Sequence, residues 1–174
     1  MAAGAGRYVG ELLGRTSSLV ITDIDNKLLR KLKSHLPENK RDLVKIKTAD
    51  ITKKFPFVAR SFDGVLCTCI LHLITKPVLK AIVNVIDRVI KPGAYAVIDF
   101  ATDINRKFPS GKRKTFRNEP KYRLAESKEL IRELFNNYEL KLSKSKFSDN
   151  LTNTTGYGYR TRGNFLLAVC KKKK

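Results

Sequence analysis

Short apolar runs alternate with amphipathic segments over most of the chain. Apolar residues at helical spacing predict helices over residues 26–36 and 75–90. Strands and helices that alternate in this way are typical of an α/β sheet. Three continuous runs rich in Val, Ile and Leu predict buried strands: Leu19–Asp23, Gly64–Ile70 and Tyr95–Phe100.

The remaining pattern completes a predicted sheet. Leu43–Thr48 alternates apolar residues with Lys, as an edge strand does. Ser127 is placed to cap an amphipathic helix, and two further strands are predicted over Glu139–Phe147 and Asn164–Cys170. The predicted fold is a doubly wound α/β sheet in a single domain over residues 1–174. Ligands of such sheets bind outside the carboxyl ends of the strands.

Three of these ends carry residues suited to a nucleotide-like ligand. Gly4-Ala5-Gly6 leads into a short helix, and glycines there let a ligand approach the backbone. Asp23 ends the strand predicted over Leu19–Asp23, where a carboxylate can accept hydrogen bonds from both hydroxyls of a ribose. Asp50 follows the edge strand, where it can accept a hydrogen bond from an exocyclic amine.

Taken together, five segments in this order resemble the class I S-adenosylmethionine-dependent methyltransferases, especially the group with quinone-biosynthesis and wobble-uridine tRNA enzymes. A nicotinamide-binding Rossmann domain fits less well, because its third small residue would fall at Val9. The matching segments are Ala2-Ala3-Gly4-Ala5-Gly6, residues 20–25, Ala49-Asp50-Ile51, residues 55–65 followed by Leu71-His72, and residues 88–93.

The resemblance implies a Rossmann-like methyltransferase sheet, mostly parallel with an antiparallel C-terminal strand, and S-adenosylmethionine as the cofactor. Cys67 would contact the cofactor through its backbone, and both Cys67 and Cys69 are expected to pack in the core. His72 is a candidate catalytic base or substrate-orienting residue, with packing at a helix start as the alternative. The implied cofactor-binding residues are Ala3, Gly4, Gly6, Asp23, Ile24, Asp50, Ile51 and Cys67.

One part of the family pattern has no counterpart in this sequence. In the family, the glycine loop follows the first strand, which is central in the order 3-2-1-4-5-7-6. That strand, and the acidic residue two positions before the loop, would fall before Met1. We therefore expect a sheet whose first central strand is missing, and a natural polypeptide that begins upstream of Met1.

Charge is concentrated in the C-terminal third. The chain has 36 Lys+Arg against 16 Asp+Glu, and residues 105–174 carry +13 of the net +20. The final run, Lys171–Lys174, is expected to be a solvated tail. Asn105–Arg123 holds eight basic residues and one acidic residue, interleaved with Phe108, Phe116 and Tyr122. Because cations neutralise phosphates and aromatic rings stack on unpaired bases, residues 105–123 are predicted to be a basic substrate-side insertion.

RNA, with tRNA as one candidate, is the predicted substrate and partner. Thr154–Gly163 is a second candidate substrate loop between the last two strands. In one alternative, the basic excess reflects host composition and the acceptor is a small metabolite; in another, the chain is a catalytically silent RNA-binding module. The predicted substrate-binding residues are Lys112, Arg113, Lys114, Phe116, Arg117, Tyr157 and Arg160.

The length of the apolar runs and the spacing of the cysteines indicate where the protein is located and whether it binds a metal. The apolar runs are too short to span a bilayer, which excludes a membrane-spanning protein. Three cysteines without disulfide-framework or zinc spacing indicate a reduced, cytoplasmic protein with no metal site.

Overall fold

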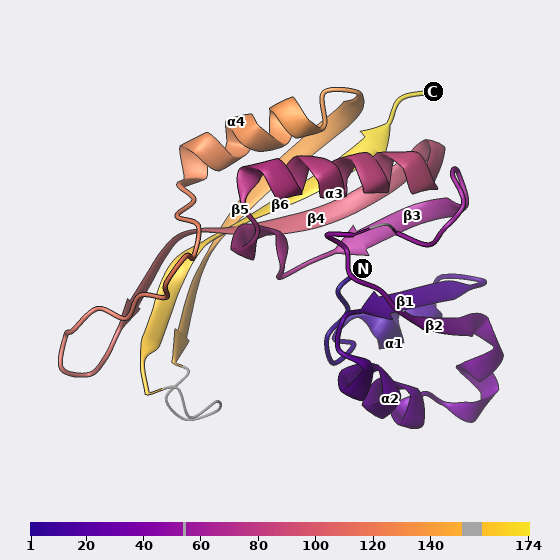
Figure 1. Ribbon diagram of the computed structural model, residues 1–174, viewed down its shortest axis with the longest axis horizontal. Helices are drawn as coiled ribbons and strands as arrows, with labels where there is room; N and C mark the ends of the chain where they lie inside the picture. Colours follow the sequence, from indigo (N-terminus) through magenta and orange to yellow (C-terminus); the bar gives the residue numbers. More distant parts are fainter. Residues whose placement is uncertain (54, 151–157) are drawn as a thin grey trace. The chain divides into compact units, whose positions relative to one another are not determined.

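The computed structural model describes residues 1–53, 55–150 and 158–174. This part of the chain divides into two compact units, Met1–Val58 and Ala59–Lys174 (Figure 1). Hydrogen-bonded strands form two sheets, one in each unit, with the orders β1-β2 and β3-β4-β6-β5.

The first unit is a small α/β layer. Its strands are parallel and pair in register from Leu19 with Val44 to Asp23 with Thr48. These strands agree with the predicted ones to within one residue. The elements are α1 (Val9–Leu13), β1 (Leu19–Asp23), α2 (Asn26–His35), a 3-10 helix (Glu38–Leu43) and β2 (Val44–Thr48).

A leucine stripe on α2 fills the core of the first unit. Leu29 and Leu32 lie one turn apart on the buried face, and Leu36 follows the last turn. The helix starts where the Asp25 carboxylate accepts hydrogen bonds from the backbone N–H groups of residues 27 and 28, which satisfies two otherwise free donors. The buried cluster is Val9, Leu13, Ile21, Leu29, Leu32 and Leu36.

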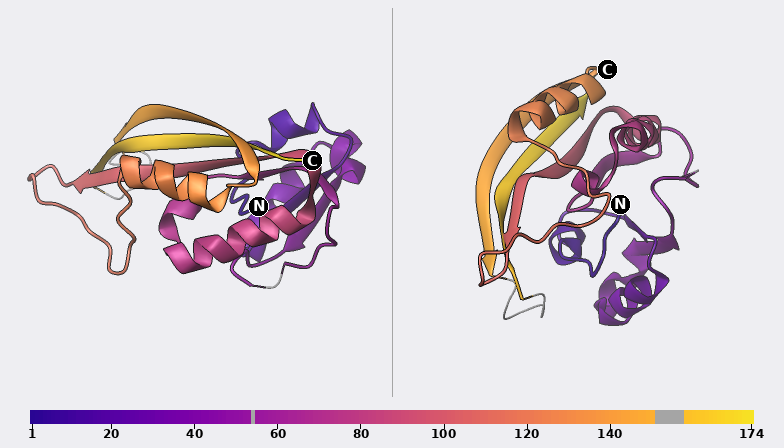
Figure 2. Two further views of the ribbon diagram at one scale, coloured as in Figure 1. Left: turned by 90° about the horizontal axis from the view of Figure 1, so that it is seen from above. Right: turned by 60° about the vertical axis from the view of Figure 1, so that its left-hand side comes forward.

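The second unit is a four-stranded sheet with helices on one face. Strand β3 is parallel to β4, and β6 is antiparallel to both of its neighbours, β4 and β5. Helices α3 and α4 lie on the same face of this sheet (Figure 2). The elements are β3 (Phe62–Cys67), a 3-10 helix (Leu71–Leu73), α3 (Lys76–Val89), β4 (Ile90–Lys107), α4 (Leu124–Leu134), β5 (Tyr138–Asn150) and β6 (Arg160–Lys172).

The predicted fold class is confirmed: the chain is an α/β protein, and its strands are mostly parallel with an antiparallel C-terminal strand.

Helix α3 buries the predicted stripe, with Leu79, Ile82 and Ile86 almost fully enclosed, and Pro77 lies in its first turn. None of the helices within the described ranges has the length and apolar character needed to cross a membrane.

Several element boundaries differ from the sequence prediction. Strand β4, predicted over Tyr95–Phe100, runs over Ile90–Lys107, and β5 and β6 are also longer than predicted. Strand β3 ends at Cys67 rather than Ile70, and its other residues are half-buried or exposed, so it is not buried on both faces. Cys69 was expected in the core, but it is exposed and has a left-handed backbone with φ of 60°. Ser127 does not cap α4, which begins at Leu124; it is fully buried within the helix.

The C-terminal lysines are not simply a solvated tail. Lys171 and Lys172 are the last residues of β6, paired with Glu139 and Tyr138 of β5. The Lys172 ammonium lies 3.0 Å from the Asp87 carboxylate and also donates to the Asp87 carbonyl. A half-buried acid in α3 therefore anchors this end of the strand.

Candidate functional site

The glycine loop of the first unit has a left-handed backbone at three positions. Ala2, Gly4 and Gly6 have φ values of 50°, 53° and 82°. A Cβ on Gly6 would lie 2.4 Å from a methyl carbon of Leu32, so the loop is pressed against α2, and its φ of 82° favours glycine. A Cβ on Gly4 would meet nothing within 4 Å, which leaves open space beside the loop backbone.

Asp23 connects the glycine loop to the end of strand β1. Its side chain is buried, with 8% exposed. One carboxylate oxygen accepts the Gly4 N–H at 2.7 Å and the other accepts the Asp25 N–H at 2.9 Å. The Asp23 carbonyl accepts the Ala49 N–H at 2.9 Å. This residue therefore joins three predicted cofactor segments by hydrogen bonds.

Asp50 is held rigidly just beyond β2. Its carboxylate accepts hydrogen bonds from the hydroxyl and the backbone N–H of Thr52, at 2.7 and 2.9 Å. These bonds lower the pKa of Asp50, and Lys53 lowers it further. Ile51 is buried, whereas Ile24 exposes 67% of its surface. An exposed isoleucine beside a buried carboxylate provides an apolar contact for a ligand.

The residues of the first unit can hold a nucleoside. A carboxylate has about four acceptor sites, and Asp23 uses two of them for the loop and the chain that follows, which leaves acceptors for ribose hydroxyls. Open backbone at Gly4 and the exposed Ile24 side chain lie at the same end of the small sheet. The structure thus brings together most of the predicted cofactor-binding residues, namely Ala3, Gly4, Gly6, Asp23, Ile24, Asp50 and Ile51.

The second unit places a buried carboxylate beside the loop after β3. Asp99 of β4 is 8% exposed and accepts the Cys69 N–H at 2.6 Å. Cys67 is fully buried at the end of β3, and burial raises the pKa of its thiol to about 11. Its side chain is therefore an unreactive packing group in the core, as expected.

His72 lies in the 3-10 helix that follows this loop. Its Nδ1 atom is buried without a hydrogen-bond partner in the described structure. Burial lowers the pKa of the imidazole, although the carboxylates of Asp99 and Glu119 act in the opposite direction. The ring is therefore held neutral near pH 7 and retains a nitrogen that can accept a proton.

The aromatic residues of the basic segment mainly pack against the protein. Tyr122 was predicted to be available for stacking, but it is 7% exposed, packs edge-on against Phe100 and donates its hydroxyl proton to the Ile74 carbonyl. Phe108 packs against Tyr159, which is also buried. Phe116 is 46% exposed and touches the same tyrosine ring.

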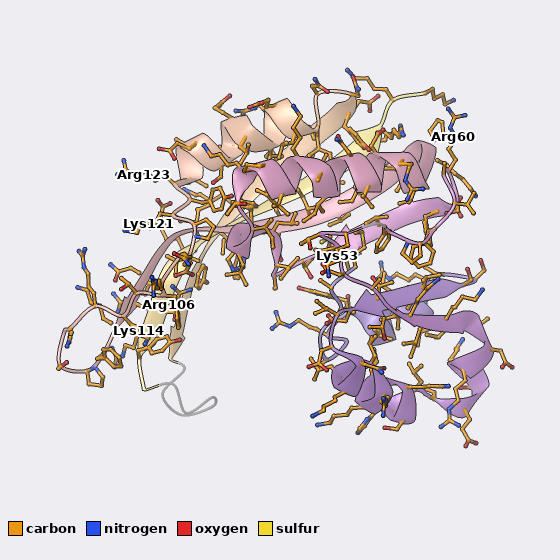
Figure 3. All side chains as sticks on the ribbon, in the orientation of Figure 1. Lys53, Arg60, Arg106, Lys114, Lys121 and Arg123 are labelled. Carbon is orange, nitrogen blue, oxygen red and sulfur yellow. The ribbon has the colours of Figure 1, made fainter. Side chains whose placement is uncertain are left out.

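A buried ion pair joins the start of the basic segment, residues 105–123, to a later part of it. The Arg106 guanidinium donates two parallel hydrogen bonds of 2.7 Å to the Glu119 carboxylate. Both side chains are less than one-fifth exposed. Figure 3 labels Arg106 and Lys114 on this part of the second unit. Both also lie over the Phe116 ring, at 5.0 and 5.1 Å from its centroid. Two cations therefore already lie against the Phe116 ring.

The predicted substrate-binding cations lie on one extended part of the second unit, where the far ends of β4, β5 and β6 run past α4 (Figure 1). Lys112, Arg113 and Arg117 are exposed and Lys114 is half-buried. Arg160 was placed in a loop, but it begins strand β6. Tyr157 lies outside the described residues.

Sequence reasoning missed two of these features. The Asp99 contact could have been suspected from a single carboxylate within the apolar run of residues 94–101. The Arg106–Glu119 pair gave no such signal, since its partners are 13 residues apart in a segment rich in charge. Among the residues that the structure describes, no group of three His, Cys, Asp or Glu side chains could hold a metal ion.

The buried neutral state of His72 predicts a loss of stability in mild acid. Burial lowers the folded-state pKa below 6.5, so the unfolded chain binds more protons as the pH falls. The free energy of unfolding should therefore decrease between about pH 7 and pH 5, and His72→Gln should reduce this decrease. Urea unfolding between about pH 5 and pH 7 measures this free energy for the wild type and the variant. His35→Gln, at the exposed second histidine, is the control; an equal effect of both variants would contradict the assignment.

Comparisons with known proteins agree with this geometry. Residues 1–93, more than half of the chain, match the family model described as a methyltransferase domain. A comparison with curated protein sequences found no match.

Several solved structures have a similar fold. The YcgJ protein from Bacillus subtilis has a TM-score of 0.72 at 13% identity, over 99% of this chain and 90% of that one. An S-adenosylmethionine-dependent methyltransferase from Mesorhizobium loti has a TM-score of 0.67 at 13% identity, over 98% and 88% of the two chains. The DhpI–SAH complex has a TM-score of 0.64 at 18% identity, over 99% and 74%.

Identities this low establish the fold, and the family match establishes membership. The chain belongs to the methyltransferase domain family and has the α/β fold of the S-adenosylmethionine-dependent methyltransferases.

Proposed function

We propose that this S-adenosylmethionine-dependent methyltransferase uses RNA as its methyl acceptor. The observation that carries the proposal is the uncompensated charge of residues 107–123. Arg106 and Glu119 neutralise each other, and Glu119 is the only acid in Asn105–Arg123. The other seven basic side chains of the segment form no ion pair within the described part of the chain. A polyanion supplies the missing negative charge.

The cofactor's binding residues belong to the first unit in this proposal. Asp23 accepts hydrogen bonds from the ribose hydroxyls at the acceptor sites that the loop leaves free. Asp50 accepts a hydrogen bond from the exocyclic amine of the adenine. Gly4 and Gly6 let the loop backbone approach the rest of the molecule, while Ile24 covers one side of it. Bound S-adenosylmethionine supplies an activated methyl group.

On the acceptor side, the protein mainly orients the nucleophile and excludes water. The Cys67 thiol is not a nucleophile, since burial raises its pKa to about 11 and holds it protonated. His72 is the candidate base: the same burial that lowers its pKa keeps its ring neutral and able to accept the proton released by the acceptor atom.

A cytoplasmic location fits the cysteine chemistry. Cys67, Cys69 and Cys170 form no disulfide bonds. Disulfides are rare in a reducing compartment, so three cysteines that form no disulfide support this location.

Tritium transfer tests the proposed acceptor class. The chain is incubated with methyl-tritiated S-adenosylmethionine and either total RNA or a deproteinised small-molecule extract from the same cells. We expect counts in the RNA fraction that are lost after ribonuclease treatment. Counts confined to the small-molecule extract would indicate a metabolite acceptor, and no counts in either would indicate a catalytically silent protein.

Replacing Asp23 tests the cofactor assignment. Asp23→Asn removes the negative charge and one acceptor oxygen, so the affinity for S-adenosylmethionine should fall about 10- to 100-fold. Equilibrium dialysis with labelled cofactor measures this affinity. The control is Asp42→Asn, which removes the same charge from an exposed position of the same unit and should bind as the wild type does. Unchanged affinity in Asp23→Asn would refute the assignment.

A further inference from the structure

Strand register places three cations side by side at the far end of the second unit. Lys107 of β4 is directly opposite Arg160 of β6 on one side and bridges to Arg113 on the other. Both pairings are antiparallel, and residues directly opposite each other in antiparallel strands point to the same face. Arg113, Lys107 and Arg160, the cation row, therefore cross three neighbouring backbone segments in one line.

The position of the cation row is fixed by backbone hydrogen bonds. A tight turn reverses the chain after β4, with the Phe108 N–H bonded to the Lys112 carbonyl at 2.9 Å. Beyond the row, the Lys114 N–H donates to the Arg106 carbonyl at 3.0 Å. These bonds hold Arg113 beside Lys107, so the row exists before any ligand arrives.

The two faces of this part of the sheet differ sharply. Arg106 and Thr161, also paired with each other, point to the opposite face from the row and are covered by the returning segment. All three residues of the cation row are exposed, and Arg162, two residues beyond Arg160, shares their face. Phe116 and Tyr159 belong to the covered face through their contacts with Arg106 and with each other.

Three like charges in adjacent register destabilise a sheet unless an anion separates them. No ion pair within the described residues neutralises Arg113, Lys107 or Arg160. The exposed large apolar residues of the described chain include none on the face of the row, whereas surfaces that bind membranes combine basic residues with inserted apolar ones. The complement of this face is therefore a chain of phosphates rather than a lipid surface.

We propose that the cation row binds the phosphate backbone of the RNA acceptor, and that it does so by charge and spacing without reading bases. This inference rests on the proposed function, because it identifies how the RNA substrate is held. It also revises the expected mode of binding: the aromatic residues of the segment anchor it to the sheet, and the cations contact the ligand.

Salt-dependent RNA binding by a charge-neutralised row tests the proposal. The variant is Lys107→Gln with Arg113→Gln and Arg160→Gln, and the probe is a fluorescein-labelled single-stranded RNA of about 20 nucleotides followed by anisotropy. The plot of log affinity against log salt should become shallower by about 2, since each lost phosphate contact removes about 0.7. Affinity at low salt should fall about tenfold or more.

A matched control removes the same charge from another surface. Lys27→Gln with Arg30→Gln and Lys33→Gln neutralises three exposed cations of α2 and should leave the slope unchanged. An equal loss in both variants would show that only net charge matters, and would overturn the proposal. It would also be overturned by an unchanged slope in the row variant, or by row-dependent binding to phosphatidylserine vesicles without binding to RNA.

Folding and catalysis are separated from binding by two additional measurements. Removing like-charge repulsion should leave the melting temperature of the row variant unchanged or raised, and the charge-conserving variant Lys107→Arg with Arg113→Lys and Arg160→Lys should retain the wild-type slope. Row-dependent RNA binding without tritium transfer would support the row and contradict the proposed acceptor. If the row variant transfers methyl groups to RNA and binds RNA with wild-type affinity, the result would support the proposed acceptor and contradict the cation row.

Discussion

The hydrogen bond from the Gly4 N–H to the Asp23 carboxylate is the interaction on which the cofactor side of the molecule depends. A buried carboxylate is costly unless it is hydrogen-bonded, and Asp23 meets this requirement with N–H groups of the glycine loop and of the turn before α2. Its carbonyl holds the chain that leads to Asp50. One residue at a strand end therefore sets the positions of three segments that are distant in sequence.

In the second unit, strand β4 has an equivalent organising role. Its first part is paired with β3 and β6 and carries the buried Asp99, which holds the loop before His72. Its last part, beyond an irregularity after Thr102, presents Lys107 on an open face and Arg106 on a covered one. A single strand thus connects the candidate base with the basic surface, and alternation of side chains separates structural cations from free ones.

The helices and strands of the first unit could be predicted from the sequence, because their apolar patterns are local. The apolar spacing of α2 and the strand end at Asp23 are visible within ten residues of chain. Arg160, Tyr122 and Lys172 were placed wrongly because their environments are set by partners 48 to 85 residues away, or by pairing across β4 and β6. The polar residues that end β4 carry no apolar alternation, so only their pairing with β6 identifies them as strand.

Amide hydrogen exchange with and without S-adenosylmethionine tests whether Asp23 assembles the cofactor site from the glycine loop and the two strand ends. We expect the cofactor to slow exchange in peptides covering residues 2–6, 22–25 and 49–52, and to leave exchange at the far ends of β4 and β6 unchanged. Slower exchange elsewhere with no change in those three segments would contradict it.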